Sequence, residues 1–276
     1  MDTLGDRMKS YESQTTCQQL ITGLPVIARM DGRSFHSFTK GLSRPYDARL
    51  SSLMIATSKY LLEEVDGAVT SYTQSDEITL LIYATIPEQQ IFFNGRVFKM
   101  VSSLAAMATA FFNAELEKYI PEKAEQLKGK RQFAQFDARV FNVPNEDEAA
   151  NHFLWRELDA TKNSISMAAQ SVYSHNELMN KNSGDKMEML WQKGINWNDY
   201  PTFFKRGTYL QRRKVTKKFS PEELAKLPEK HPARVDNDME FTRQEVMRLN
   251  IPPLNRIPFK ADTIFGRDEK IEVEKV

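Results

Sequence analysis

The order of the predicted strands and helices over the first 145 residues limits the possible folds more than any other feature of the sequence. Apolar stretches bounded by turn-forming residues predict strands at residues 24–30, 68–73, 78–83 and 133–143. Apolar residues at helical spacing predict one helix after Asp47, a potential N-cap, and another over about 92–118. The resulting order, β-α-β-β-α-β, is that of ferredoxin-like and polymerase-palm domains. We therefore predict an α+β fold with a palm-like core at residues 1–145.

The remainder of the chain is expected to fall into two further regions. Residues 146–215 are predicted to be mainly helical, and residues 216–276, which are rich in proline and charge, are predicted to form an extended tail with short helices. The segment SPEELAKL at 220–227 carries a capping-box pattern, Ser220 with Glu223. We expect the tail to pack across the rest of the protein or against a neighbouring subunit.

Composition places few limits on function. The chain has 276 residues, 41% of them hydrophobic, which is enough for a sizeable core. Its formal net charge is +1, so a nucleic-acid partner would have to bind a local basic patch. Cys17 is the single cysteine, the N-terminal residues lack the apolar core of a signal peptide, and no apolar run approaches the roughly 20 residues of a membrane span. We predict a cytoplasmic protein without a membrane partner.

Acidic residues lie at the ends of two predicted strands. Asp31 and Gly32 close the first strand, and Asp76 and Glu77 precede or open the third. In the split β-α-β arrangement these strands are antiparallel neighbours, so the acids should meet at one sheet edge. Carboxylates that lie this close repel each other and raise each other's pKa, and a divalent cation bound between them offsets the repulsion. Oxygen ligands favour Mg²⁺ over Zn²⁺ at such a site.

This reasoning predicts Asp31 and Asp76 as side-chain ligands of Mg²⁺, with the Gly32 carbonyl as a further ligand. Successive strand residues point to opposite faces, so Glu77 is expected to support the site or to face the substrate. Asp31, Asp76 and Glu77 are the predicted catalytic acids. The alternative is that Asp31-Gly32 is only a turn dipeptide and that Ser75-Asp76 is only a hairpin corner.

Three motifs together resemble one enzyme family. They are MDGRSFHSF at 30–38, YTQSDE at 72–77 and FDAR at 136–139, and they are similar to motifs of the histidine-tRNA guanylyltransferase family, whose members extend RNA in the 3′-to-5′ direction. The similarity runs from about Leu4 to Leu210. It implies a palm that holds two Mg²⁺ ions through Asp31, Gly32 and Asp76, with ATP and GTP or other NTPs as substrates, tRNA as partner and a homotetrameric assembly.

The chain departs from the eukaryotic members at one informative place. After Trp155-Arg156 the eukaryotic proteins continue with a histidine-isoleucine-asparagine-asparagine stretch, whereas residues 160–170 here read ATKNSISMAAQ. The sequence instead resembles the guanylyltransferase-like branch of bacteria, archaea and phages. That resemblance implies template-dependent repair of tRNA 5′ ends, in which ATP activates the 5′ phosphate and the 3′-hydroxyl of an incoming NTP then attacks.

Such a reaction requires groups that hold triphosphates. Main-chain amides after the aspartate-glycine turn could cradle phosphates, and the Arg33 side chain could add a cation. Arg96 and Lys99, three residues apart in a predicted helix, could converge on one anion. The alternatives are a surface ion pair for Arg33, a structural role for His36 and a solvated basic helix face. The predicted nucleotide-binding residues are Arg33, Ser34, Phe35, His36, Ser75, Arg96 and Lys99.

Basic and amide side chains in the second half predict contacts with RNA. The stretch 205–214 interleaves cations with an aromatic residue, a combination that binds phosphates and stacks bases. An ordinary solvated surface is the alternative for each position. The predicted RNA-binding residues are Lys162, Asn163, Lys193, Asn198, Lys205, Arg206, Arg212 and Arg213.

Three other functions remain open at this point. One is a guanylyltransferase strictly specific for histidine tRNA. Another is a palm-fold nucleotide cyclase, which would use a similar metal cluster within one nucleotide. The third is a noncatalytic RNA-binding module, against which the presence of Asp31, Asp76 and Glu77 argues.

Overall fold

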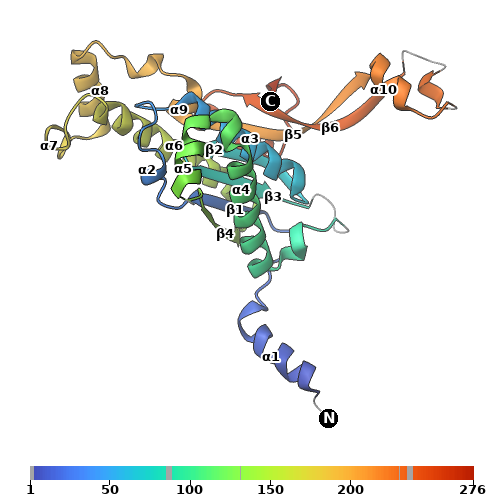
Figure 1. The fold of residues 1–276 in the computed structure, drawn as a ribbon. Coiled ribbons are helices and arrows are strands. Elements are labelled where there is room, and N and C mark those ends of the chain that lie inside the picture. The colour runs from blue at the N-terminus through green and yellow to red at the C-terminus, as the bar shows by residue number, and fades with distance from the viewer. Residues whose placement is uncertain (1–2, 85–88, 131, 230, 235–238) are drawn as a thin grey trace.

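A seven-stranded antiparallel sheet forms the centre of the protein in a computed structural model that describes residues 3–84, 89–130, 132–229, 231–234 and 239–276 (Figure 1). The strand order is β4-β1-β3-β2-β5-β6-β7. The strands are β1 Val26–Gly32, β2 Ala68–Gln74, β3 Glu77–Ile82, β4 Phe136–Asn142, β5 Thr208–Lys218, β6 Glu240–Asn250 and β7 Glu272–Lys275. The α-helices are α1 Leu4–Thr16, α2 Phe35–Phe38, α3 Ala48–Glu64, α4 Val97–Tyr119, α5 Pro121–Lys130, α6 Glu146–Gln170, α7 His175–Leu178, α8 Ser183–Gln192, α9 Thr202–Arg206, α10 Pro221–Lys226 and α11 Lys260–Ile264.

The predicted α+β fold and β-α-β-β-α-β order are confirmed by β1, α3, β2, β3, α4 and β4. Asp47 is the N-cap of α3, as predicted, and its carboxylate accepts a hydrogen bond from the Arg49 backbone N–H at 3.0 Å. Strand β1 lies between β3 and β4, as expected of the split arrangement. It continues to Gly32, two residues beyond the predicted end, so Asp31 lies within the strand.

Alternating side chains divide the sheet into two packed faces. Val26, Ala28 and Met30 of β1 point into a core shared with α3 and α4, whereas Ile27 packs with residues of α6 and the C-terminal region. Helix α4 is long and apolar enough to cross a membrane by length and composition, contrary to the expectation that no apolar run approaches that length. Its buried residues, such as Phe112, pack into the first core.

The prediction for the C-terminal region was wrong in one respect. Residues 216–276, predicted as an extended tail, contain the end of β5 and all of β6 and β7, so one sheet crosses all three predicted regions. Buried Glu157 of α6 holds this part, because its carboxylate accepts hydrogen bonds from the Leu254 N–H at 2.9 Å and the Tyr209 hydroxyl at 3.0 Å. The capping box of α10, Ser220 with Glu223, is present as predicted.

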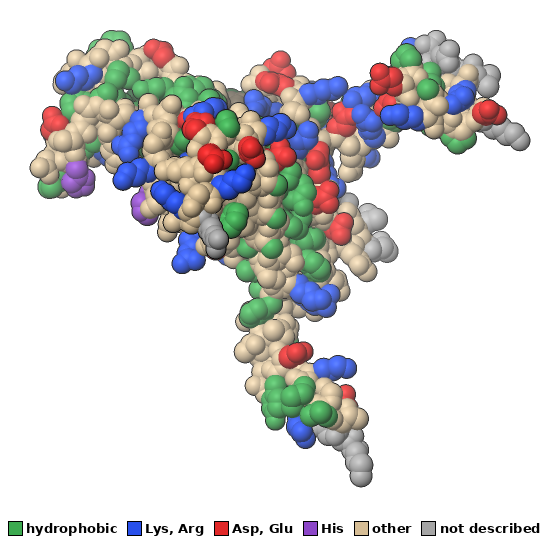
Figure 2. All heavy atoms as spheres, viewed as in Figure 1, with side chains coloured by type: hydrophobic (Ala, Val, Ile, Leu, Met, Phe, Trp, Pro, Cys, Tyr) green, Lys and Arg blue, Asp and Glu red, His purple; other side chains and the backbone are tan. Residues whose placement is uncertain are grey.

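The β5–β6 hairpin carries α10 well away from the main body (Figure 1). Lys and Arg side chains along this hairpin are interspersed with Asp and Glu (Figure 2). Examples are the pairs Lys217–Glu245 and Arg243–Glu223. The hairpin therefore does not present a continuous positive surface on the side that Figure 2 shows.

Candidate active site

Two turns at one sheet edge bring Asp31 and Asp76 together, as the strand order predicts. Asp31 is paired with Glu77 in the β1–β3 register, and the Gly32 N–H donates a hydrogen bond to the Asp76 carbonyl at 3.0 Å. Ser75 and Asp76 form the two-residue connection between β2 and β3, and Ser75 adopts a left-handed φ of 54°. The turn between β2 and β3 is thus joined to the end of β1 by strand pairing and by a backbone hydrogen bond.

Glycine at position 32 is required by the packing of Phe35. A Cβ on Gly32 would lie 2.3 Å from Cδ2 of Phe35, whose ring is buried. Phe35 stacks among Phe38, Phe112 and Phe136 with ring centroids 4.9, 5.6 and 5.2 Å away. Because these aromatic contacts hold α2 against the sheet, the turn after Asp31 keeps a defined shape. Phe35 therefore reaches the site through its backbone, while its side chain belongs to the core.

The electrostatic environment of Asp76 fits a cation site. Burial raises the pKa of the Asp76 carboxyl, and the negative charges of Asp31 and Glu77 raise it further, against a hydrogen bond from Ser75 that lowers it. A positive ion beside Asp31 and Asp76 would stabilise the ionised form of the Asp76 carboxyl.

The residues present fit a magnesium ion better than zinc. Asp31 and Asp76 supply carboxylate oxygens, and Gly32 supplies a carbonyl. Within the described ranges no cluster of three or more His, Cys, Asp or Glu residues is placed to hold a metal. Mg²⁺ is commonly held by one or two carboxylates and completes its shell with water and substrate phosphates.

A cavity of about 570 Å³ opens beside the two turns. Six of the predicted site residues line it: Gly32, Ser34, Phe35, His36, Ser75 and Asp76. Other lining residues were not predicted as site residues from the sequence: Tyr46, Asp47, Met167, Gln170, Phe203 and Phe204.

The aromatic part of the cavity wall is built from two distant segments. Tyr46, from the loop before α3, packs its ring 5.2 Å from Phe203 and 4.8 Å from Phe204 of α9. The pair of phenylalanines in a polar stretch was the only sequence signal for this wall. Aromatic rings and polar turns in one cavity are suited to a ligand with a planar apolar part and a charged part.

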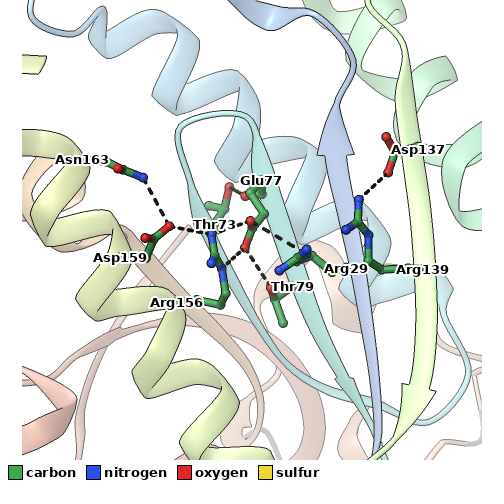
Figure 3. Close-up of polar contacts among 9 residues, drawn as sticks. All are labelled: Arg29, Thr73, Glu77, Thr79, Asp137, Arg139, Arg156, Asp159 and Asn163. Atoms are coloured by element: carbon green, nitrogen blue, oxygen red, sulfur yellow. Dashed lines mark hydrogen bonds and ion pairs between the residues drawn. The ribbon is translucent and has the colours of Figure 1, made fainter.

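Glu77 points away from this cavity, toward α6 (Figure 3). Its carboxylate accepts two hydrogen bonds from Arg156, from Nε at 2.7 Å and from Nη2 at 2.8 Å. Arg156 also reaches Asp159 at 3.1 Å, and the Glu77 and Arg156 side chains are 11% and 10% exposed. The expectation that Asp76 and Glu77 face opposite sides agrees with this arrangement, in which Glu77 ties α6 to the sheet.

Three predicted nucleotide-binding residues lie outside the cavity lining. Arg33 is exposed and donates to the Gln135 side chain at 3.1 Å. Arg96 forms a bridge with Gln19, in the segment that leads into β1, so Arg96 and nearby Lys99 lie at the opposite end of the sheet from Asp31. The convergence of Arg96 and Lys99 on one anion stays a prediction.

Predicted RNA-binding arginines are occupied by internal contacts. Arg212 donates to the Leu62 carbonyl at 2.7 Å and to the Glu63 carbonyl at 2.8 Å, at the end of α3. Arg213 donates to the Asp268 carbonyl at 2.8 Å, and Arg206 approaches Glu157 at 3.6 Å. These three side chains join parts of the fold, which argues against the role in RNA binding that the sequence suggested.

The remaining predicted RNA-binding residues lie on or near α6 and α8. Lys162 and Asn163 are exposed on α6, and Asn163 donates to Asp159 at 3.3 Å. Lys193 lies over the ring of Tyr173, 5.4 Å from its centroid. Lys205 lies 5.7 Å from the Trp197 ring and donates to the Asn198 carbonyl at 2.5 Å. Their part in RNA binding stays a prediction.

Comparison with known proteins agrees with this geometry. The family model described as tRNAHis guanylyltransferase matches residues 5–144. The tRNA(His) guanylyltransferase of Debaryomyces hansenii is 30% identical over 200 residues, which are 68% of this chain and 73% of that protein.

Solved structures of bacterial tRNA(His) guanylyltransferase-like proteins are similar in fold. One in complex with ATP is 40% identical, with a TM-score of 0.70 over 76% of this chain and 88% of the other. Another, in complex with GTP, is 31% identical, with a TM-score of 0.68 over 96% and 98%. With the family model covering half of the chain and the paired aspartates in place, the chain belongs to the tRNA(His) guanylyltransferase family of nucleotidyltransferases.

Proposed function

We propose that this protein adds nucleotides to the 5′ end of tRNA in the 3′-to-5′ direction, directed by the opposite strand, as a repair enzyme. The observation that carries the proposal is the meeting of Asp31 and Asp76 beside a 570 Å³ cavity lined by polar turns and aromatic rings. This combination suits a nucleoside triphosphate next to a cation. The ATP and GTP complexes of the bacterial relatives support the same class of ligand here.

Each part of the site has a role in such a reaction. Asp31, Asp76 and the Gly32 carbonyl would hold Mg²⁺, and two ions, when bound, would stabilise the attacking and leaving oxygens. Backbone N–H groups of residues 34–36, with the Ser34 and Ser75 hydroxyls, would bind phosphates, whereas the Arg33 N–H donates to the Gln135 carbonyl. The rings of Tyr46 and Phe203 would contact the base.

The reaction has two phosphoryl transfers under this proposal. ATP first activates the 5′ phosphate of the RNA by adenylylation, which releases pyrophosphate. The 3′-hydroxyl of the incoming NTP then attacks the activated phosphate and AMP leaves. Catalysis of both steps rests on positioning and on charge stabilisation rather than on a covalent protein intermediate.

The experiment that tests the proposal is a length assay. Purified protein is incubated with Mg²⁺, ATP, all four NTPs and a labelled tRNA that lacks its first nucleotide. We expect extension by the nucleotide complementary to the opposite strand, and a changed opposite base should change the nucleotide added. Extension by G whatever the opposite base would instead support a strict histidine-tRNA guanylyltransferase.

Two other results would overturn the proposed function. NTP turnover to a cyclic product without RNA would favour a cyclase, and RNA binding without any turnover would favour a noncatalytic module. A homotetramer and a cytoplasmic location stay predictions from the family resemblance.

Magnesium is predicted to stabilise the folded protein through Asp76. Because the pKa of Asp76 is raised, its ionised form lowers stability in the absence of metal, and this loss develops as pH rises from the usual value of 3.8 through the raised pKa. At pH 7.5, Mg²⁺ at ten times its Kd should add about 1.4 kcal/mol, visible as a higher Tm.

The shift should disappear in Asp76→Asn and should weaken in wild type as pH falls and Asp76 takes up a proton. Without Mg²⁺, Asp76→Asn should melt above wild type. Exposed Asp147 of α6 provides the matched control, since Asp147→Asn removes a carboxylate far from the turns and should keep the magnesium shift. An equal shift in Asp76→Asn would place the ion elsewhere.

A further inference from the structure

Two arginines occupy directly opposite positions on neighbouring strands beside the proposed active site. Arg29 of β1 and Arg139 of β4 are directly paired in the β1–β4 register, on the sheet face that turns toward α6 (Figure 3). Like charges at directly opposite positions destabilise a sheet. A bound anion between the two guanidinium groups would reverse this effect.

The existing partners of both arginines leave room for an anion. Arg29 is 4.0 Å from Glu77, whose carboxylate is already held by Arg156, and Nε of Arg29 is buried without a hydrogen-bond partner. Arg139 pairs with Asp137 at 3.2 Å, but these side chains are 48% and 58% exposed. Such an exposed pair contributes little and can be exchanged for a ligand phosphate.

An exposed aromatic ring completes the arrangement. Trp155 on α6 is 52% exposed, although large apolar side chains are usually covered. Arg156 lies 4.6 Å and Arg29 5.7 Å from its ring centroid, and the His152 ring packs edge-on at 5.4 Å. Glu77 fixes the Arg156 guanidinium, which packs over the indole ring of Trp155. About half of the Trp155 surface is left exposed to solvent.

The position of this surface relates it to the RNA rather than to the incoming triphosphate. Arg29 precedes Asp31 by two residues on the same strand face, which corresponds to about 7 Å. The cavity proposed for the NTP is lined by other residues, none of them Arg29, Arg139 or Trp155. A strand end that reaches Asp31 would therefore pass over this surface.

We propose that Trp155, Arg29 and Arg139 bind one nucleotide of the RNA substrate, with its base stacked on Trp155 and its phosphate between the two arginines. This inference rests on the proposed function, because it names the place of the second substrate at that site. An aromatic ring beside cations is the usual combination for binding single-stranded nucleic acid.

The test compares binding of RNA with use of NTP. The probe is a fluorescently labelled, 5′-phosphorylated tRNA that lacks its first nucleotide, with Kd measured by anisotropy; the KM for NTP comes from the extension assay. Trp155→Ala should weaken RNA binding by about tenfold, as expected for loss of one stacked base. Trp155→Phe should recover most of this loss, and the KM for NTP should stay within about twofold.

Arg139→Gln should weaken binding and lower the slope of log Kd against log salt by about one, because one phosphate contact is lost. Trp191→Ala is the matched control, since Trp191 of α8 is 64% exposed and lies outside this surface. RNA binding by Trp155→Ala equal to that of Trp191→Ala would overturn the inference. So would a raised KM for NTP with unchanged RNA binding, which would indicate a second nucleotide site.

The binding measurement also separates this inference from the proposed function. If wild-type protein fails to extend RNA while Trp155→Ala still weakens RNA binding, the proposed reaction is wrong and the binding surface stands. If extension proceeds and Trp155→Ala binds RNA like wild type, the reaction stands and the binding surface is wrong.

Discussion

Replacing Asp76 by asparagine is expected to lower the rate of nucleotide addition by on the order of 10²- to 10³-fold, the loss typical when one charge-stabilising group is removed from a transition-state site. The substitution keeps size and shape but removes the charge that would hold Mg²⁺ with Asp31. The measurement is a single-turnover rate at saturating NTP and RNA. Higher Mg²⁺ should not restore the rate, because the amide is a much weaker ligand.

RNA binding separates a lost metal ligand from a damaged fold. We expect Asp76→Asn to bind tRNA within about twofold of wild type, because Asp76 lies in the cavity and not on the surface around Trp155. Asp147 lies in the first turn of α6, and Asp147→Asn should keep normal activity. Equal loss of transfer and RNA binding in Asp76→Asn would remove the assignment of Asp76 as a metal ligand.

Replacing Glu77 by glutamine is expected to lower the free energy of unfolding by about 3 kcal/mol, because it leaves Arg156 as a mostly buried charge without its bidentate partner. The residual contact of Arg156 with Asp159, at 3.1 Å, keeps the loss near the lower end of the range for buried pairs. Chemical denaturation with urea measures it. The double substitution Glu77→Leu with Arg156→Met should recover much of the loss, since the Arg156 charge is then removed together with its partner.

A surface ion pair provides the control for Glu77. Arg267 pairs with Glu146 at 2.5 Å, with side chains 46% and 33% exposed, and Glu146→Gln should cost less than about 1 kcal/mol. Glu77→Gln should retain the magnesium-dependent rise in Tm. Loss of that rise with unchanged stability would instead make Glu77 a metal ligand.

The central part of the site could be predicted from local patterns. Antiparallel pairing of β1 with β3 follows from the element order, and this pairing places Asp31 next to the Ser75-Asp76 turn. The opposite orientations of Asp76 and Glu77 follow from strand alternation. The sequence could not predict Arg156 as the partner of Glu77, because the two residues are 79 positions apart.

Strands β5 and β6 were missed for a physical reason. Where they project from the body, neither face of the hairpin covers a core, so the sequence lacks alternating apolar residues and shows charged ones instead. The basic stretch at 205–214 therefore predicted an RNA contact. In the structure Arg212 and Arg213 satisfy backbone carbonyls of α3 and of the segment after α11.

By itself, the sequence determined the α+β class, the order of the core elements and the placement of Asp31 next to the Ser75-Asp76 turn, because period, turn chemistry and strand adjacency depend on neighbouring residues. Only the tertiary structure decided the aromatic wall of the cavity, the burial of Glu77 against Arg156 and the exposed ring of Trp155. These features depend on how α6, α9 and the C-terminal strands pack on the sheet. Such packing joins residues that no local pattern connects.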